Sequence, residues 1–180
     1  MKHVLVIGGT GMLANTSIWL THNGYKVSVV GRDRHKLNKL AEDNENIICI
    51  SVDYNNEKQF RSEIHNSIAA NGPYDAVVAW IHNEDEKIID IVSHEISKVS
   101  NNEWSLFHVL GSSSNLQEIM KELGNIENCK YHQVQLGFVI ENNISRWLTH
   151  DEISKGVIHA IKSNQKTYVV GRLTQWHMRP

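Results

Sequence analysis

Residues 4–14, VLVIGGTGMLA, decide the fold class of this chain. The first four are apolar without alternation, which is typical of a strand buried on both faces of a parallel sheet. The glycines that follow allow a tight turn, and the residues after them predict a helix over 12–22, with Asn23-Gly24 at its end. A buried strand that turns directly into a helix is the opening unit of a doubly wound α/β domain.

The same alternation continues to the end of the chain. Further strands are expected at residues 27–30, 47–52, 76–81, 106–110, 132–140 and 168–170. Further helices are expected at residues 33–42, 56–70, 88–99, 115–123 and 149–161. The apolar residues that recur at helical spacing in the third of these helices are Ile88, Ile89, Val92, Ile96 and Val99. Because alternating strands and helices pair in parallel through right-handed crossovers, we expect one domain over residues 1–180, with a sheet of about six to seven strands.

The composition argues against several classes of protein. The 180 residues include 18 Lys and Arg and 20 Asp and Glu, a net charge of −2, so no basic surface for nucleic acid or for a membrane is expected. The apolar run that opens the chain is too short for a signal peptide or a membrane span. Cys49 and Cys129 form no paired motif, and the 11 histidines show no ligand spacing, so we expect the reducing cytoplasm and no metal site.

The glycine loop predicts a site for an anion. Gly8 allows the turn, Gly11 lets a pyrophosphate approach the backbone, and Ala14 is small enough for the helix to lie close to the strand. The loop also offers free N–H groups at the positive end of a helix, and Thr10 adds a hydroxyl. We expect a dinucleotide whose contacts with the loop come from Gly8, Gly9, Thr10, Gly11, Met12 and Leu13. A tight turn without a ligand is the alternative, whereas a P-loop is disfavoured because no Gly-Lys-Ser/Thr follows.

The end of the second strand favours NADP. In this type of domain an acidic residue at that point holds the 2′-hydroxyl of a ribose, while an arginine accommodates a 2′-phosphate. Arg32 occupies this position, and Arg34 adds positive charge beside it. Asp33, between them, is expected to cap the following helix. We therefore expect NADP as the cofactor, with NAD as the second choice. The alternative without a ligand is that these basic residues form a solvated turn.

With these motifs the sequence resembles the short-chain dehydrogenase/reductase family, particularly its atypical members, over nearly the whole chain. The glycine loop and the basic turn are the specific matches. Supporting matches are Asp53-Tyr54, the serines of residues 112–114, and Leu136-Gly137-Phe138, where the family's proline is replaced. The resemblance implies that Asp53, beside Tyr54, contacts the adenine amino group, and that the protein is a homo-oligomer. Trp80, after the fourth strand, is expected to border the cofactor, with a core position as the alternative.

Two departures from the family concern its chemistry. The Asn-Asn-Ala-Gly that ends the family's fourth strand is here Ala79-Trp80-Ile81-His82. The family's Tyr-x-x-x-Lys pair, in which the lysine lowers the pKa of the proton-donating tyrosine, is also missing. No tyrosine lies between Tyr74 and Tyr131, and Tyr131 is followed by Gln135 where the lysine belongs. We infer that the helix over 115–123, which should carry the pair, is truncated.

Three residues remain as candidates for catalysis. Ser112 matches the family's serine, and His82 and Tyr131 are expected near the carboxyl edge of the sheet. The alternatives are a serine that satisfies backbone groups, a histidine without a catalytic role and a tyrosine that packs at a strand end. The resemblance implies an NADP(H)-dependent oxidoreductase that acts on an unidentified small carbonyl compound or alcohol. The alternative is a non-catalytic module that senses NADP(H).

Overall fold

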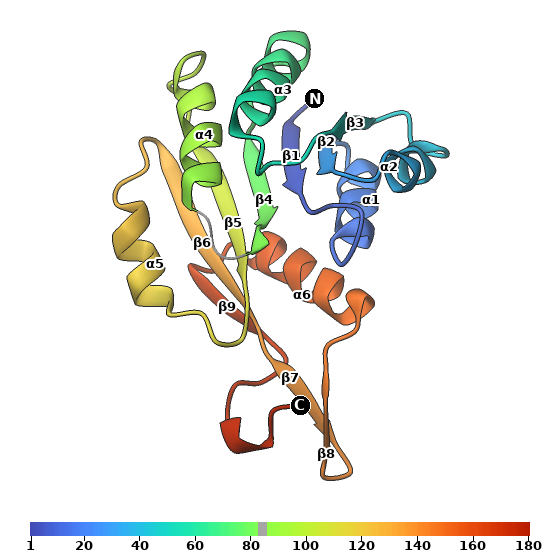
Figure 1. The fold of residues 1–180 in the computed structure, drawn as a ribbon, viewed down its shortest axis with the longest axis vertical. Helices are drawn as coiled ribbons and strands as arrows, with labels where there is room; N and C mark the ends of the chain where they lie inside the picture. Colours follow the sequence, from blue (N-terminus) through green and yellow to red (C-terminus); the bar gives the residue numbers. More distant parts are fainter. Residues whose placement is uncertain (83–85) are drawn as a thin grey trace.

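In the computed structural model, which describes residues 1–82 and 86–180, seven parallel strands form one sheet in the order β3-β2-β1-β4-β5-β6-β9 (Figure 1). The strands are β1 His3–Ile7, β2 Lys26–Gly31, β3 Ile47–Ser51, β4 Ala76–Trp80, β5 Trp104–Leu110, β6 Cys129–Leu136 and β9 Thr167–Val170. β1 pairs with both β2 and β4, so the strand order reverses there. Such a reversal opens a crevice at the carboxyl ends of the strands, where ligands bind in these folds. The expected doubly wound α/β fold is confirmed.

The helices cover both faces of the sheet (Figure 1). They are α1 Ala14–His22, α2 Arg34–Ala41, α3 Glu57–Asn71, α4 Glu86–Ser97, α5 Leu116–Leu123 and α6 His150–Ser163. The core on one face contains Phe60 of α3, Ile88 of α4 and Ile119 of α5. The core on the other face contains Leu20 of α1, Leu37 of α2 and Val157 of α6, among other residues. None of the helices in the described part of the chain combines the length and the apolar character that a membrane span requires.

Several expected helix boundaries differ from the observed ones by two residues, and the start of α1 and the end of α4 show why. α1 begins at Ala14 rather than at Met12, because the chain turns there and the N–H of Ala14 donates to the carbonyl of Gly11 at 3.1 Å. Val99 lies beyond the end of α4 and is 53% exposed, so it does not belong to the apolar face of that helix. Its N–H bonds the carbonyl of Ile96 in the turn that ends the helix.

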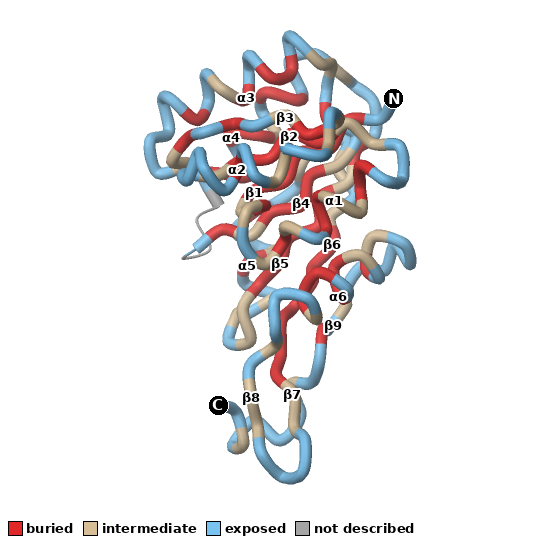
Figure 2. Tube along the Cα trace, turned by 90° about the vertical axis from the view of Figure 1, so that its right-hand side faces the viewer, coloured by how far each residue is buried: buried red, intermediate tan, exposed pale blue. Residues whose placement is uncertain are grey.

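The expected sixth strand over 132–140 is two strands. β6 ends at Leu136, and after Gly137 the chain forms an antiparallel hairpin of β7 Phe138–Glu141 and β8 Ile144–Trp147. A Cβ on Gly137 would overlap the backbone of Arg172, so glycine is needed where the chain leaves the sheet. The hairpin extends beyond the sheet, and Figure 2 shows exposed residues at its tip and buried ones along the sheet strands.

Candidate functional site

A cavity of about 320 Å³, which we call the loop cavity, opens at the carboxyl ends of β1 to β4. Gly8 follows β1, Gly31 ends β2, Val52 follows β3 and Trp80 ends β4, so four neighbouring strands meet at this point. The full lining is Gly8, Thr10, Gly11, Met12, Gly31, Arg32, Lys36, Val52, Tyr54, Trp80, His82 and His150. It includes most of the residues expected to hold a dinucleotide.

The glycines of the loop have different roles. Gly8 has a φ of +81°, and a Cβ there would lie 3.0 Å from the carbonyl oxygen of Trp80, so the turn requires glycine. A Cβ on Gly11 would have no atom within 4 Å, which leaves its face of the cavity open to a ligand. A Cβ on Gly9 would lie 2.6 Å from Cγ1 of Val29, so the close approach of the loop to the sheet occurs at Gly9. Ala14, expected to allow the helix to lie close to the strand, is half-buried and lines a groove between α1 and α2.

Two cations of the basic turn line the loop cavity. Arg32 does so as expected, and Lys36 in the first turn of α2 does so as well, whereas Arg34 is not among the lining residues. Asp33 caps α2 by accepting from the N–H groups of His35 (2.9 Å) and Lys36 (3.2 Å), which confirms the expected cap. Among the described lining residues none is acidic, so the cavity suits an anion.

Asp53 and Tyr54 make different contacts, and of the two only Tyr54 lines the loop cavity. Oδ1 of Asp53 accepts from the backbone N–H and the side-chain amide of Asn55, both at 3.0 Å, and Asp53 is not among the lining residues. Tyr54 lines the cavity, and its hydroxyl accepts from the backbone N–H of His82 at 3.2 Å. This bond joins the chain after β3 to the chain after β4 and places His82 at the cavity wall.

A second cavity, which we call the serine cavity, has a volume of about 290 Å³ and begins where the first one ends. It shares Met12, Trp80 and His150 with the loop cavity. Its other lining residues are Gly111, Ser112, Leu136, Gly137, Trp147, Leu148 and Ile153. Ser112 therefore lies where a ligand of the loop cavity can meet a second molecule. Leu13 and Gly9 line neither cavity; Leu13 is fully buried in the core beneath the loop.

No family model and no curated protein matches the sequence, but many solved structures match the fold. An oxidoreductase of Aeromonas hydrophila, assigned to the short-chain dehydrogenase/reductase family, superimposes with a TM-score of 0.71 at 15% identity, over 96% of this chain and 99% of that one. The citronellol catabolism dehydrogenase of Pseudomonas aeruginosa gives 0.71 at 17% identity over 97% and 95%. A Serratia marcescens short-chain dehydrogenase/reductase gives 0.69 at 14% over 94% and 97%. This chain has the short-chain dehydrogenase/reductase fold.

In this short-chain dehydrogenase/reductase fold, the turn after β5 that carries Ser112 is held by Gln135, a residue that sequence reasoning did not assign to the site. Nε2 of Gln135, on β6, donates to the backbone carbonyls of Gly111 (3.3 Å), Ser112 (3.3 Å) and Ser114 (3.0 Å). Gln135 stands where the family's lysine is expected from Tyr131, and its side chain fixes the turn after β5 instead. The helix after this turn, α5, has eight residues, as short as expected.

Tyr131 lies away from both cavities. It pairs with Leu106 near the start of β5, whereas Gln135 pairs with Leu110 at the carboxyl end, so the expectation of a carboxyl-edge position is wrong. The Tyr131 hydroxyl lies 3.1 Å from Nδ1 of His108 and accepts from Nε2 of Gln133 at 3.3 Å. The Tyr131 hydroxyl thus contacts the buried ring of His108. Of the three catalytic candidates, Ser112 lines the serine cavity and His82 lines the loop cavity, whereas Tyr131 lines neither.

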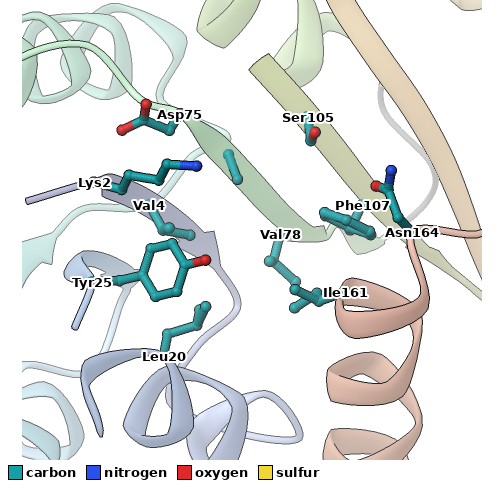
Figure 3. Close-up of a pocket in the computed structure, with 11 residues that line it drawn as sticks. Lys2, Val4, Leu20, Tyr25, Asp75, Val78, Ser105, Phe107, Ile161 and Asn164 are labelled. Atoms are coloured by element: carbon teal, nitrogen blue, oxygen red, sulfur yellow. The ribbon is translucent and has the colours of Figure 1, made fainter. Parts of the chain in front are cut away.

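A third cavity, of about 160 Å³, lies at the amino ends of the strands, opposite the loop cavity, and Figure 3 shows the residues that line it. It lies between the amino ends of β1 and β4 and the ends of α1 and α6, with Leu20, Val78 and Ile161 in its wall. Figure 3 shows Lys2 and Asp75 near one another at one side. Because ligands of doubly wound folds bind at the carboxyl ends of the strands, we place the candidate site at the loop and serine cavities.

Proposed function

We propose that the protein is an NADP(H)-dependent oxidoreductase that acts on a small carbonyl compound or alcohol. The observation that carries the proposal is the continuity of the two cavities. A loop cavity with open glycine backbone and two cations adjoins, through Met12, Trp80 and His150, a cavity that holds Ser112. A dinucleotide bound there supplies or accepts a hydride at its nicotinamide ring.

The residues present fit this cofactor. The open face of Gly11 and the Thr10 hydroxyl suit the pyrophosphate, and Tyr54 and Trp80 offer aromatic walls. Arg32 and Lys36 would bind the 2′-phosphate, because a dianion gains charge-assisted hydrogen bonds from both cations. The missing acidic residue at the end of β2 removes the usual partner of a free 2′-hydroxyl.

Ser112 would orient the substrate by donating a hydrogen bond to its oxygen. We expect Ser112→Ala to abolish the turnover of small carbonyl substrates while NADPH still binds with unchanged affinity. Ser113→Ala is the matched control, because Ser113 lines neither cavity. Turnover that is unchanged in Ser112→Ala would remove Ser112 from the mechanism.

A second candidate function is an NADP(H)-sensing module without catalysis. It is favoured by the absence of the Tyr-x-x-x-Lys pair, since α5 is short and carries no tyrosine. This function predicts NADPH binding without turnover of any carbonyl substrate, and a change of oligomer on binding that sedimentation would detect. A homo-oligomer and a location in the reducing cytoplasm, consistent with the free Cys49 and Cys129, are parts of both proposals.

A further inference from the structure

The serine cavity has few groups that can take part in proton transfer. Apart from glycine, its described lining consists of apolar side chains, the hydroxyl of Ser112 and the imidazole of His150. Imidazole is the side chain that ordinarily gains and loses a proton near neutral pH. Among the described residues that line this cavity, His150 is therefore the one ionisable side chain that can give a proton to a substrate oxygen.

The fold fixes His150 at the junction of the two cavities. It is the first residue of α6, and the backbone on either side is held by a capping box. The N–H of Thr149 donates to Oε2 of Glu152 at 2.8 Å, and the N–H of Glu152 donates to Oγ1 of Thr149 at 3.2 Å. Arg146 donates to both carboxylate oxygens of Glu152, at 2.9 and 3.0 Å, and so ties the cap to the hairpin.

A further bond connects this helix with the glycine loop. Oγ of Ser154 donates to the carbonyl of Met12 at 2.7 Å, and Ser154 is almost fully buried. Met12 and His150 both line the two cavities, so the bond holds α6, which begins with His150, against the glycine loop. The His150 side chain itself is exposed, which gives it access to protons from solvent.

We propose that His150 is the proton-transfer residue of the reaction, a proposal that rests on the proposed function. In the reducing direction an N–H bond of the imidazolium would break and an O–H bond would form on the substrate oxygen, as the π bond of the carbonyl group opens. The hydride that the carbonyl carbon accepts would be supplied by the reduced dinucleotide that Arg32 and Lys36 would hold, so the carbonyl compound would be reduced to an alcohol at the expense of that dinucleotide. The neutral imidazole then takes a proton from water, and in the oxidising direction the same atoms move in reverse.

The lining also selects the substrate class used as a probe. Because His150 is the one ionisable side chain among the described lining residues of the serine cavity, an uncharged carbonyl compound with an apolar body fits, and cyclohexanone is a suitable probe. Other titratable groups lie close by. The loop cavity has Arg32, Lys36, Tyr54 and His82, and α6 has Asp151, which is paired with Lys155, and Glu152, which is paired with Arg146.

The first test follows the His150 imidazole by NMR in the complex with NADP⁺, where no reduction can occur. Its Cε1–H resonance is assigned by its loss in His150→Gln. We expect cyclohexanone to shift this resonance, because a ketone oxygen accepts a hydrogen bond from an N–H of the imidazole ring. A resonance that cyclohexanone leaves unchanged, in protein that binds NADP⁺, would overturn the role of His150 alone. Failure to bind NADP⁺ would instead overturn the proposed function, and this role with it.

The second test is kinetic. We expect His150→Gln to lower kcat for ketone reduction by about 10²-fold or more, with the Kd for NADPH unchanged, and to remove the limb of the pH profile that reports the acid. Added imidazole should restore part of the activity of His150→Ala. The control is His22→Gln, because His22 is an exposed histidine at the end of α1, outside both cavities. A His150→Gln enzyme with the wild-type kcat and pH profile would overturn the proposal.

Discussion

The side-chain amide of Gln135 donates a hydrogen bond to the backbone carbonyl of Ser112, at 3.3 Å. The same nitrogen contacts the carbonyls before and after it in the turn, so one side chain on β6 holds the turn that follows β5. The position of the Ser112 hydroxyl in its cavity therefore depends on a residue that is nearly buried and contacts no cavity itself.

Gln135→Leu should loosen this turn. It removes the side-chain donor from three half-buried carbonyls, although that of Gly111 keeps a backbone donor, the N–H of Ser114, so we expect the free energy of unfolding to fall by about 1–3 kcal/mol. Urea denaturation measures this loss, and hydrogen exchange should show faster exchange at the N–H of Ser114, which donates to the carbonyl of Gly111 in this turn. Gln117→Leu, at an exposed position of α5, is the control and should change stability by less than about 0.5 kcal/mol. Unaltered exchange in Gln135→Leu would show that the turn holds itself.

Two glycines of the loop should respond to alanine in opposite ways. Gly9→Ala should lower the free energy of unfolding by about 1–3 kcal/mol, because its methyl group meets Val29 Cγ1 at 2.6 Å. Gly11→Ala should leave stability almost unchanged and weaken NADPH binding, because its methyl group enters the open face of the loop cavity. Urea denaturation and an NADPH titration of both variants test the contrast. Equal NADPH affinity in Gly11→Ala and wild type would place the ligand elsewhere.

The buried His108 predicts a loss of stability in acid. Burial lowers its pKa from 6.5 to about 4, so the folded state keeps the ring neutral while the unfolded state protonates it. The contribution of the neutral His108 ring to the free energy of unfolding is complete above pH 6.5. It falls as the pH drops from 6.5 towards 4, by roughly 3 kcal/mol in total. His3, whose pKa burial also lowers, acts in the same direction. In urea denaturation at pH 7 and pH 4.5, His108→Leu should show a smaller acid loss than wild type, and an equal loss would contradict this origin.

Trp147 should affect the substrate and not the cofactor. It lies on β8, lines the serine cavity and does not line the loop cavity. We expect Trp147→Ala to raise KM for a small ketone about tenfold, a loss of ~1.4 kcal/mol, with the Kd for NADPH unchanged. Trp176→Ala is the matched control. The rings of Trp147 and Trp176 lie at similar distances from the ring of Phe138, 6.5 and 6.4 Å, but Trp176 lines neither cavity. Equal changes in both variants would indicate a loosened hairpin instead.

Local patterns predicted the strands and helices of the sheet well, because each depends on a few neighbouring residues. The hairpin after β6 was missed, although the consecutive asparagines Asn142 and Asn143 are a sequence signal for a two-residue turn. In the structure both have the positive φ that such a turn requires, 51° and 61°. The continuous apolar residues around Gly137 concealed the break, since the contact of this glycine with Arg172 is visible only in three dimensions.

The candidate site was predicted less completely than the fold. The glycine loop and Arg32 could be assigned to the site because each belongs to a local sequence pattern with a known role in binding. Gln135 and His150 gain their positions from packing between elements far apart in the chain, and no local pattern marks them. Tyr131 was misplaced for a related reason. The sequence predicts a strand there, but the register with β5 decides how far along the sheet the tyrosine lies.

The most direct measurement of the central claim is a calorimetric titration of the protein with NADPH and with NADH, repeated with Arg32→Ala and Arg34→Ala. Because Arg32 lines the loop cavity and Arg34 does not, we expect NADPH to bind in the micromolar range and NADH about tenfold or more weakly. Arg32→Ala should remove this preference, and Arg34→Ala should keep it. Absence of saturable binding of either dinucleotide would contradict the account, and equal affinities that Arg32→Ala leaves unchanged would contradict its assignment of NADP.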